Sequence, residues 1–301
     1  MDVAVTRIEL PSPVRAAASD GTSVWCAGAG GVRAYTTSGT PLDAGDEAGE
    51  LPELRSLAAV PGTVSGTAGM PGALAGTVVM PRTFATAPPV DSLPQGSLAG
   101  ASADRVYWLD QRGVPVASAR FNGRVLAGGG EIWAVGAGQA RRLIEPGHLG
   151  EPVALPGLDL CAVQGERLWW TSKRDTLLRG GPREVDLGTR ERGSMIVCAG
   201  SLWISVAGGL LRVSAWSGEP RRFVGVPAGL VPFLACANGV LAGGGRDLFA
   251  LAPAAGAAVR VIRLGLKAPL RLMIAAGKHV WAFPRGRPQA LIVPIGDLGP
   301  V

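Results

Sequence analysis

Residues 200–222, GSLWISVAGGLLRVSAWSGEPRR, contain the pattern that decides the fold. A small turn precedes an apolar strand with a Trp, a Gly-rich turn follows, and a second apolar strand ends in a polar turn. The pattern returns with a Trp in GTSVWCAGAGGVRAY (21–35), GGEIWAVGAGQARRL (129–143), GERLWWTSKRDTLLR (165–179) and GKHVWAFPRGRPQAL (277–291). A pattern that returns along the whole chain indicates a repeat architecture.

Eight copies can be aligned on the Trp or on the residue that replaces it. Most copies follow one another at roughly 35 to 40 residues, the length of one supersecondary unit in several repeat folds. The interval of 26 residues between Tyr107 and Trp133 is too short for a full unit. The clear copies lie at Trp25, Tyr107, Trp133, Trp169, Trp203 and Trp281, and weaker ones at Ser65 and Leu241.

Each copy divides into short strands separated by Gly, Pro, Asn or Asp turns, and no segment has a long helical period with caps. The unit from Ser194 to Val226 supplies four strands, SMIVCAG, SLWISV, LLRVSAW and RRFVGV. Four antiparallel strands per repeat are typical of a β-propeller blade. We therefore predict one all-β domain over residues 1–301, a propeller of eight counted blades. The ring has seven blades if either the degenerate unit at 54–90 or the unit with the 26-residue interval is an insertion. A pair of β-sandwiches is the main alternative fold.

The two ends of the chain complement each other. The last unit supplies only three strands, LRLMIAA, HVWAF and ALIVPI, whereas the N-terminus begins with an unassigned strand, VTRIEL. We predict that residues 3–10 form the outer strand of the last blade, which would close the ring without an open sheet edge.

The LWxxxxxGxLxRV pattern resembles that of bacterial propellers with short blades, of the virginiamycin B lyase-like, NHL-like and quinoprotein-like kinds. The resemblance covers nearly the whole chain but rests on packing residues, which say little about activity. It implies His, acidic residues and a divalent metal in the lyase members. This chain has only His148 and His279 and no WFTE-type motif, so no lyase residue is transferred to it. The GH…WD signature of WD40 repeats is also absent.

The repeated Trp has a structural interpretation, because one large ring per blade in one register would fill the space between neighbouring sheets. We expect this of Trp25, Trp133, Trp169, Trp203 and Trp281. Trp170 and Trp216 depart from the register, so either could lie at an exposed edge or in a pocket.

A second register consists of Arg residues. Arg15, Arg55 and Arg271 each lie ten residues before the aligned position of their unit, Arg124 lies nine before, and Asp159 occupies the matching place in another unit. First strands of propeller blades line the central channel, so these residues should gather at one mouth, with Arg271, Arg15 and Arg55 side by side and the other two across from them. Clustered guanidinium groups repel one another and pair with carboxylate or phosphate through two parallel hydrogen bonds, which predicts an anion site. Alternatively, each Arg pairs with a loop acid such as Asp20, Glu53 or Asp159, or faces water.

Composition excludes several function classes. The net charge is +6, but the basic residues are scattered without a Lys/Arg run, which disfavours a nucleic-acid partner. No apolar run approaches a membrane span and the N-terminus lacks signal-peptide features, so we expect a cytoplasmic protein. The four Cys lie far apart, which predicts buried thiols without disulfides or a metal site. The abundance of Ala, Gly, Pro and Arg is typical of a GC-rich bacterial genome.

These observations favour a monomeric, ligand- or partner-binding propeller without a cofactor, one that binds a small anionic molecule at the channel mouth or a protein partner. The alternative is a cofactor-independent lyase or cyclase of bacterial secondary metabolism, with His279 or Asp159 as candidate catalytic residues. A carbohydrate-binding propeller ranks third, because polar companions do not repeat with the Trp. No triad, P-loop or metal-ligand cluster is present in the sequence.

Overall fold

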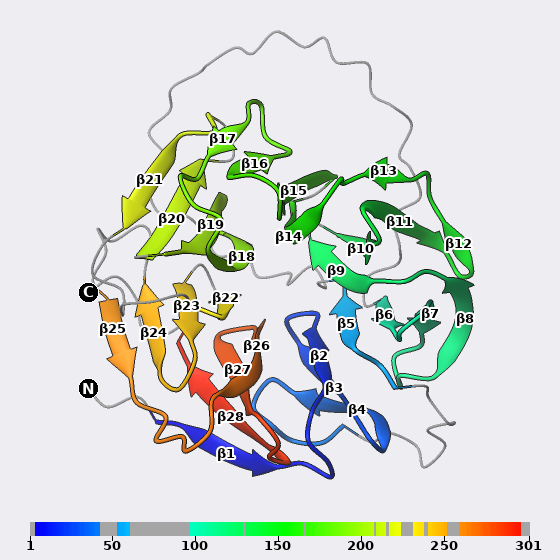
Figure 1. Ribbon diagram of the computed structural model, residues 1–301. Coiled ribbons are helices and arrows are strands. Elements are labelled where there is room, and N and C mark those ends of the chain that lie inside the picture. Colours follow the sequence, from blue (N-terminus) through cyan, green and yellow to red (C-terminus); the bar gives the residue numbers. More distant parts are fainter. Residues whose placement is uncertain are drawn as a thin grey trace, which may run out of the picture.

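The computed structural model describes residues 4–42, 53–60, 97–128, 130–164, 166–207, 209–214, 217–223, 231–237, 240–251 and 259–295. In these residues the protein forms seven antiparallel sheets arranged in a ring, a β-propeller (Figure 1). Five of these sheets have four strands, one has three and one has five. Seven, the lower of the two predicted blade counts, is therefore confirmed.

The sheets follow one another in chain order, and each is described from the channel outward. Sheet one consists of β2 (Ala16–Ser19), β3 (Ser23–Gly28) and β4 (Gly31–Thr36). Sheet two consists of β5 (Ser56–Ala59), β6 (Leu98–Ala101), β7 (Arg105–Leu109) and β8 (Pro115–Arg120). Sheet three consists of β9 (Arg124–Gly128), β10 (Glu131–Gly136), β11 (Gln139–Glu145), β12 (His148–Leu149) and β13 (Val153–Ala154).

Sheets four to seven follow the same order. They consist of β14 (Leu158–Gln164), β15 (Arg167–Ser172), β16 (Leu177–Arg179) and β17 (Val185–Asp186); of β18 (Arg192–Cys198), β19 (Ser201–Val206), β20 (Gly209–Ser214) and β21 (Pro220–Phe223); of β22 (Phe233–Ala237), β23 (Val240–Gly244), β24 (Leu248–Leu251) and β25 (Val259–Ile262); and of β26 (Leu270–Ala276), β27 (His279–Pro284), β28 (Gln289–Pro294) and β1 (Thr6–Glu9).

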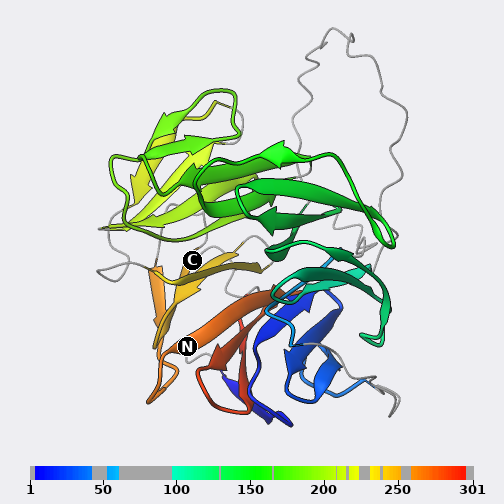
Figure 2. The same cartoon turned by 45° about the vertical axis from the view of Figure 1, so that its right-hand side comes forward.

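The inner strands close a circle around the channel. Each contacts the inner strand of the next sheet, in the order β2, β5, β9, β14, β18, β22, β26 and back to β2. At the rim, β1 pairs with β28 over four residues, from Thr6 opposite Ile292 to Glu9 opposite Gln289. The N-terminal strand thus lies where residues 3–10 were expected, at the outer edge of the last sheet (Figure 1). Figure 2 shows the sheets obliquely, with the twist of each from its inner to its outer strand.

The eighth predicted unit is not a separate sheet among the described residues. Tyr107 lies on β7, the third strand of sheet two, and the inner strand of that sheet is β5, from the degenerate unit. The Arg55 N–H donates to Ala101 as the Arg15 N–H donates to Ala27, so Ala99 occupies the place of Trp25. The short interval before Trp133 therefore arose from aligning a third strand with second strands. The rest of that unit, residues 61–96, lies outside the described residues.

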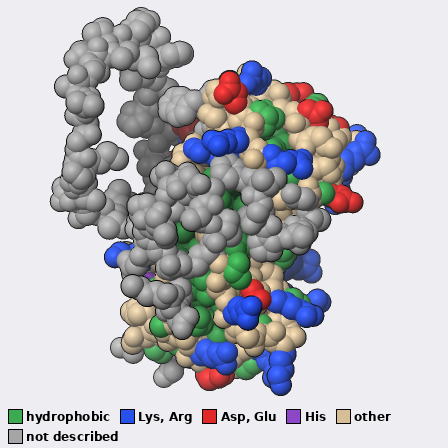
Figure 3. Space-filling model, turned by 90° about the vertical axis from the view of Figure 1, so that its left-hand side faces the viewer, with side chains coloured by type: hydrophobic (Ala, Val, Ile, Leu, Met, Phe, Trp, Pro, Cys, Tyr) green, Lys and Arg blue, Asp and Glu red, His purple; other side chains and the backbone are tan. Residues whose placement is uncertain are grey.

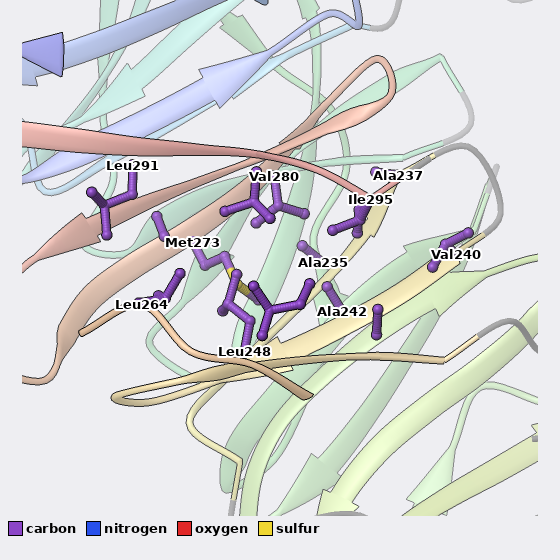
Figure 4. Packing of buried hydrophobic residues seen from close by; sticks show 14 of the residues in the cluster. Ala235, Ala237, Val240, Ala242, Leu248, Leu264, Met273, Val280, Leu291 and Ile295 are labelled. Carbon is purple, nitrogen blue, oxygen red and sulfur yellow. The ribbon is translucent and has the colours of Figure 1, made fainter. Parts of the chain in front are cut away.

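The packing interpretation of the repeated Trp is confirmed. Trp25, Trp133, Trp169, Trp203 and Trp281 all lie on second strands and are at most 7% exposed. Each belongs to a core cluster shared with the next sheet round the ring, for example Trp203 with Phe249 and Leu251 of sheet six. Between sheets six and seven smaller residues fill this space, among them Ala235, Ala242, Leu248 and Val280 (Figure 4).

The structure also bears on the cysteines and on the two Trp residues outside the repeated register. Cys198 and Cys236 form a disulfide between the inner strands β18 and β22, with Cα atoms 5.4 Å apart, so the expectation of four thiols is wrong. Their separation of 38 residues is one blade, which places them side by side on adjacent inner strands. Trp170 is half-buried, with the Arg179 guanidinium 5.0 Å from its ring centroid. Trp216 lies outside the described residues.

Candidate functional site

The first residues of the inner strands surround a cavity of about 720 Å³ at one mouth of the channel. Inner strands β2, β5, β9, β22 and β26 contribute their opening residues to it. In every sheet the chain runs strand by strand from the channel to the rim and then returns to the next inner strand. All inner strands therefore run in the same direction, and their first residues lie at the same face. We call this space the channel-mouth cavity.

All four Arg residues of the predicted register line the channel-mouth cavity. They come from four consecutive inner strands, so Arg271, Arg15, Arg55 and Arg124 follow one another round the ring. Arg124 was expected across the mouth, but it lies next to Arg55 in the order because the inner strands β5 and β9 contact each other directly. A fifth Arg, Arg285, also lines the cavity, from the turn after β27.

Backbone hydrogen bonds fix these positions. The N–H groups of Arg15 and Arg55 donate to the second strands of their own sheets, to Ala27 (2.8 Å) and Ala101 (2.7 Å). The Val125 N–H donates to Ser56 Oγ at 2.9 Å, which joins the residues next to Arg124 and Arg55. The Arg285 N–H donates to the carbonyl of Pro269 at 3.0 Å, just before β26. The Arg side chains therefore start from a backbone that pairing has already ordered.

The charges at this mouth are largely uncompensated. Arg15 forms an ion pair with Glu53, one of the acids proposed for it from sequence. Within the described part of the chain, Arg55, Arg124, Arg271 and Arg285 have no ion-pair partner within 4 Å. Like charges that converge on one cavity repel, and this repulsion is relieved when an anion enters.

Apolar side chains also line the channel-mouth cavity. Half-buried side chains at the cavity come from Leu126, Phe233, Leu272 and Ile274. The arrangement combines hydrogen-bond donors of fixed positive charge with apolar surface. It can hold an anionic group and an attached apolar portion.

A second cavity, of about 650 Å³, lies between sheets three and four. We call it the side cavity, and Arg124 lines both spaces. Its other charged lining residues are Lys173, Arg174 and Asp159. Asp159 therefore lies in the side cavity, while the lining residues of the channel-mouth cavity do not include it.

The Asp159 carboxylate has a structural partner. Its Oδ2 lies 3.4 Å from Nε of Arg192, whose side chain is fully buried. Arg192 also donates to the carbonyl oxygens of Ser172 (2.7 Å) and Asp175 (3.1 Å) in the neighbouring sheet. A buried guanidinium needs such a counter-charge, so the charge of Asp159 compensates that of Arg192.

The two His residues lie away from the Arg residues. His279 opens β27 and pairs with Ala276 at the far end of β26, whereas Arg271 lies at the start of that strand. Its Nδ1 is buried and has no hydrogen-bond partner among the described residues. His148 is 76% exposed at the rim and 3.9 Å from Glu145. The structure therefore brings neither His to the channel-mouth cavity.

Arg285, Lys173 and Arg174 are the charged lining residues of the two cavities that the sequence reasoning missed. All three lie in turns between strands rather than in the inner-strand register. Because successive strands alternate in direction, the turn after every second strand returns to the face where inner strands begin. That alternation was the signal that could have identified them.

Charge elsewhere on the molecule is mixed. Figure 3 shows basic and acidic side chains interspersed on one side of the molecule. Over the residues that the structure describes, no three or more His, Cys, Asp or Glu side chains group closely enough to hold a metal ion. Over the same part of the chain, no helix has the length and apolar character needed to cross a membrane.

No protein-family model matches the sequence, and the search of curated proteins found no match. Solved structures do match over nearly the full length. The chain is similar to a catalytically inactive virginiamycin B lyase from Staphylococcus aureus with quinupristin, with a TM-score of 0.68, 12% identity, and coverage of 97% of this chain and 99% of that one.

Two further β-propeller domains are similar as well. They are the WD40 β-propeller domain of Doa1 (TM-score 0.65, 13% identity, 97% of this chain and 95% of that chain) and the β-propeller domain of Cps50 (Swd1) from Myceliophteria thermophila (TM-score 0.63, 12% identity, 97% and 100%). At such identities the likeness concerns the fold alone. The chain is a β-propeller that resembles the virginiamycin B lyase and WD40 propellers in its blade pattern.

Proposed function

We propose that this protein binds an anionic small molecule at the channel-mouth cavity. The observation that carries the proposal is the convergence of Arg271, Arg15, Arg55 and Arg124, from four consecutive inner strands, on one cavity. Three of these four have no ion-pair partner in the described residues. Several guanidinium groups around one cavity can donate hydrogen bonds to the same anion.

The chemistry of the guanidinium group supports this function. Arg stays charged at any physiological pH and presents a planar fork of donors that matches carboxylate or phosphate oxygens. Hydrogen bonds to charged groups contribute more than neutral ones, about 1.5–3 kcal/mol each. The half-buried Leu126, Phe233 and Leu272 would contact an apolar portion of the same ligand.

Binding is supported better than catalysis. A lyase or cyclase needs a proton donor or acceptor beside the reacting atoms. Among the described lining residues of the channel-mouth cavity none is Asp, Glu, His, Cys or Tyr. The two catalytic candidates from the sequence lie elsewhere, since Asp159 pairs with Arg192 and His279 is at the other end of its sheet.

A thermal-shift panel tests the proposal. Inorganic phosphate, nucleotides, small carboxylates and long-chain carboxylic acids are added to the wild type and to the Arg55→Ala/Arg271→Ala variant. Neither residue has an ion-pair partner in the described residues, so the variant leaves none of the described carboxylates unpaired. A ligand at a hundred times its Kd stabilises by about 2.7 kcal/mol, which corresponds to roughly 5 °C for a chain of this size.

The matched control removes two exposed Arg side chains from outer strands, Arg120→Ala on β8 and Arg222→Ala on β21. It makes the same change in net charge without touching either cavity. We expect one class of anion to stabilise the wild type and the control and to lose its effect in the cavity variant. Equal shifts in all three proteins, or no shift with any anion, would contradict the proposal.

A further inference from the structure

The side cavity adds a second group of cations next to the first. Lys173 and Arg174 lie in the turn between β15 and β16, and both are exposed. The Lys173 N–H donates to the Gly157 carbonyl at 2.8 Å, and the Arg174 N–H donates to Ser172 Oγ at 3.1 Å. These bonds hold the turn against the start of β14, so both residues line the cavity.

Glycines let the segments around the side cavity pack closely against one another. A Cβ at Gly123 would lie 2.4 Å from the Val135 carbonyl oxygen, and one at Gly136 would lie 2.3 Å from that of Asn122. Gly157 has φ +72°, and a Cβ there would lie 2.6 Å from Ser172 Oγ. A side chain at any of these positions would collide with the chain that bounds the cavity. These three glycines line the side cavity together with Arg124, Lys173 and Arg174.

The charge balance of the side cavity favours an anion. Asp159 is the acidic residue that lines it, and the buried Arg192 already compensates that charge. Within the described ranges, Arg124, Lys173 and Arg174 have no ion-pair partner within 4 Å. Three cations at this cavity are thus available to a ligand.

Arg124 lines both cavities, so one guanidinium group borders both spaces. We propose that a single ligand occupies both cavities and carries two anionic groups joined by a spacer, one group at Arg15, Arg55 and Arg271 and the other at Lys173 and Arg174. Arg124 lies between the two groups. This inference rests on the proposed function, because it names the class of anion as an elongated dianion.

The expected advantage of such a ligand comes from linkage. Once one anionic group is bound, the second meets its cations at an effective concentration of roughly millimolar, so a dianion binds more tightly than its halves. The gain in affinity should pass through a maximum as the spacer lengthens. A short spacer cannot span the distance between the two groups of cations, and a long spacer lowers the effective concentration of the second anionic group.

Isothermal titration calorimetry with straight-chain α,ω-dicarboxylates of increasing length tests the inference, with monocarboxylates of equal chain length as controls. In the wild type we expect the best dicarboxylate to bind with one-to-one stoichiometry and ~10–100-fold more tightly than the matched monocarboxylate. A parallel series of inorganic phosphate, diphosphate and triphosphate distinguishes phosphate-based dianions from dicarboxylates.

Two variants separate this inference from the proposed function. Lys173→Ala/Arg174→Ala should lower dicarboxylate affinity at least tenfold and leave monocarboxylate affinity unchanged, whereas Arg55→Ala/Arg271→Ala should weaken both. Dianions that bind no more tightly than monoanions, or that bind the Lys173/Arg174 variant as tightly as the wild type, would overturn the two-cavity ligand and leave the channel-mouth site standing. If no carboxylate or phosphate probe binds the wild type, both proposals fail.

Discussion

Trp281 connects the last sheet to the first, and its replacement should weaken closure of the ring. Its side chain is fully buried, and its Nε1–H donates to the Thr37 carbonyl of sheet one at 3.0 Å. Its ring lies 5.9 Å from that of Tyr35, also in sheet one, and 6.1 Å from that of Phe283. The side chain thus contributes apolar contacts and one hydrogen bond between the two ends of the chain.

The two contributions can be separated by two substitutions. Trp281→Phe keeps most of the buried ring but leaves the Thr37 carbonyl without its donor, at a cost of about 1–2 kcal/mol in the free energy of unfolding. Trp281→Ala also removes the ring and leaves a cavity, which raises the cost to about 4–6 kcal/mol, from the usual Trp→Ala cost and the lost hydrogen bond.

Urea unfolding followed by far-UV circular dichroism measures both effects, because the Trp281 fluorescence is itself lost in the variants. Trp170→Ala is the control, since Trp170 is half-buried beneath Arg179 and joins no two sheets through a hydrogen bond that the structure records. If Trp281→Ala costs no more than Trp170→Ala, then Trp281 does not hold the ring closed and the reasoning is refuted.

Four further predictions concern the closure of the ring and the cysteines. Deletion of residues 1–9 should lower Tm by several degrees in a thermal melt, because it exposes the paired edge of β28; an unchanged Tm would show that β1 is dispensable. Gly39→Ala should cost at least about 1 kcal/mol in urea unfolding, because φ is +101° and the new Cβ would lie 2.7 Å from Ile292 Cδ1; a neutral result would contradict this packing. Burial raises the pKa of Cys161 to about 11 and that of Cys26 still further. Both thiols should therefore stay unlabelled by iodoacetamide from pH 7 to 9, since almost no thiolate forms there, and should react only after unfolding; rapid native labelling would show that they are accessible. In the unfolded, unreduced chain a thiol assay should count two Cys, and four after reduction.

The repeat could be identified from sequence because every unit has short apolar strands and five of the seven second strands carry a buried Trp. The blade count was harder to predict, since alternation of apolar residues does not distinguish a second strand from a third. Tyr107 belongs to a third strand, and Ala99 occupies the position of the missing Trp. The second strand of sheet two, β6, therefore lacks the large ring that reveals the register in other sheets.

The candidate site could be predicted in part. The register of Arg15, Arg55 and Arg271 predicted a shared mouth, because inner strands run in one direction round the ring. The disulfide was missed although the spacing of its cysteines equals one repeat, which places such residues on adjacent strands. The side cavity could not be predicted, since it depends on how neighbouring sheets meet and on backbone contacts such as that of Gly157 with Lys173.

The central claim is that the converging Arg residues bind an anion. Isothermal titration calorimetry of the most stabilising anion tests it most directly, with the wild type, Arg55→Ala/Arg271→Ala, and the outer-strand control Arg120→Ala/Arg222→Ala. Loss of two charge-assisted hydrogen bonds of about 1.5–3 kcal/mol each predicts at least a hundredfold weaker Kd in the cavity variant. The control should bind like the wild type. Equal affinity in all three proteins would contradict the account and direct the search to protein partners on other surfaces of the propeller.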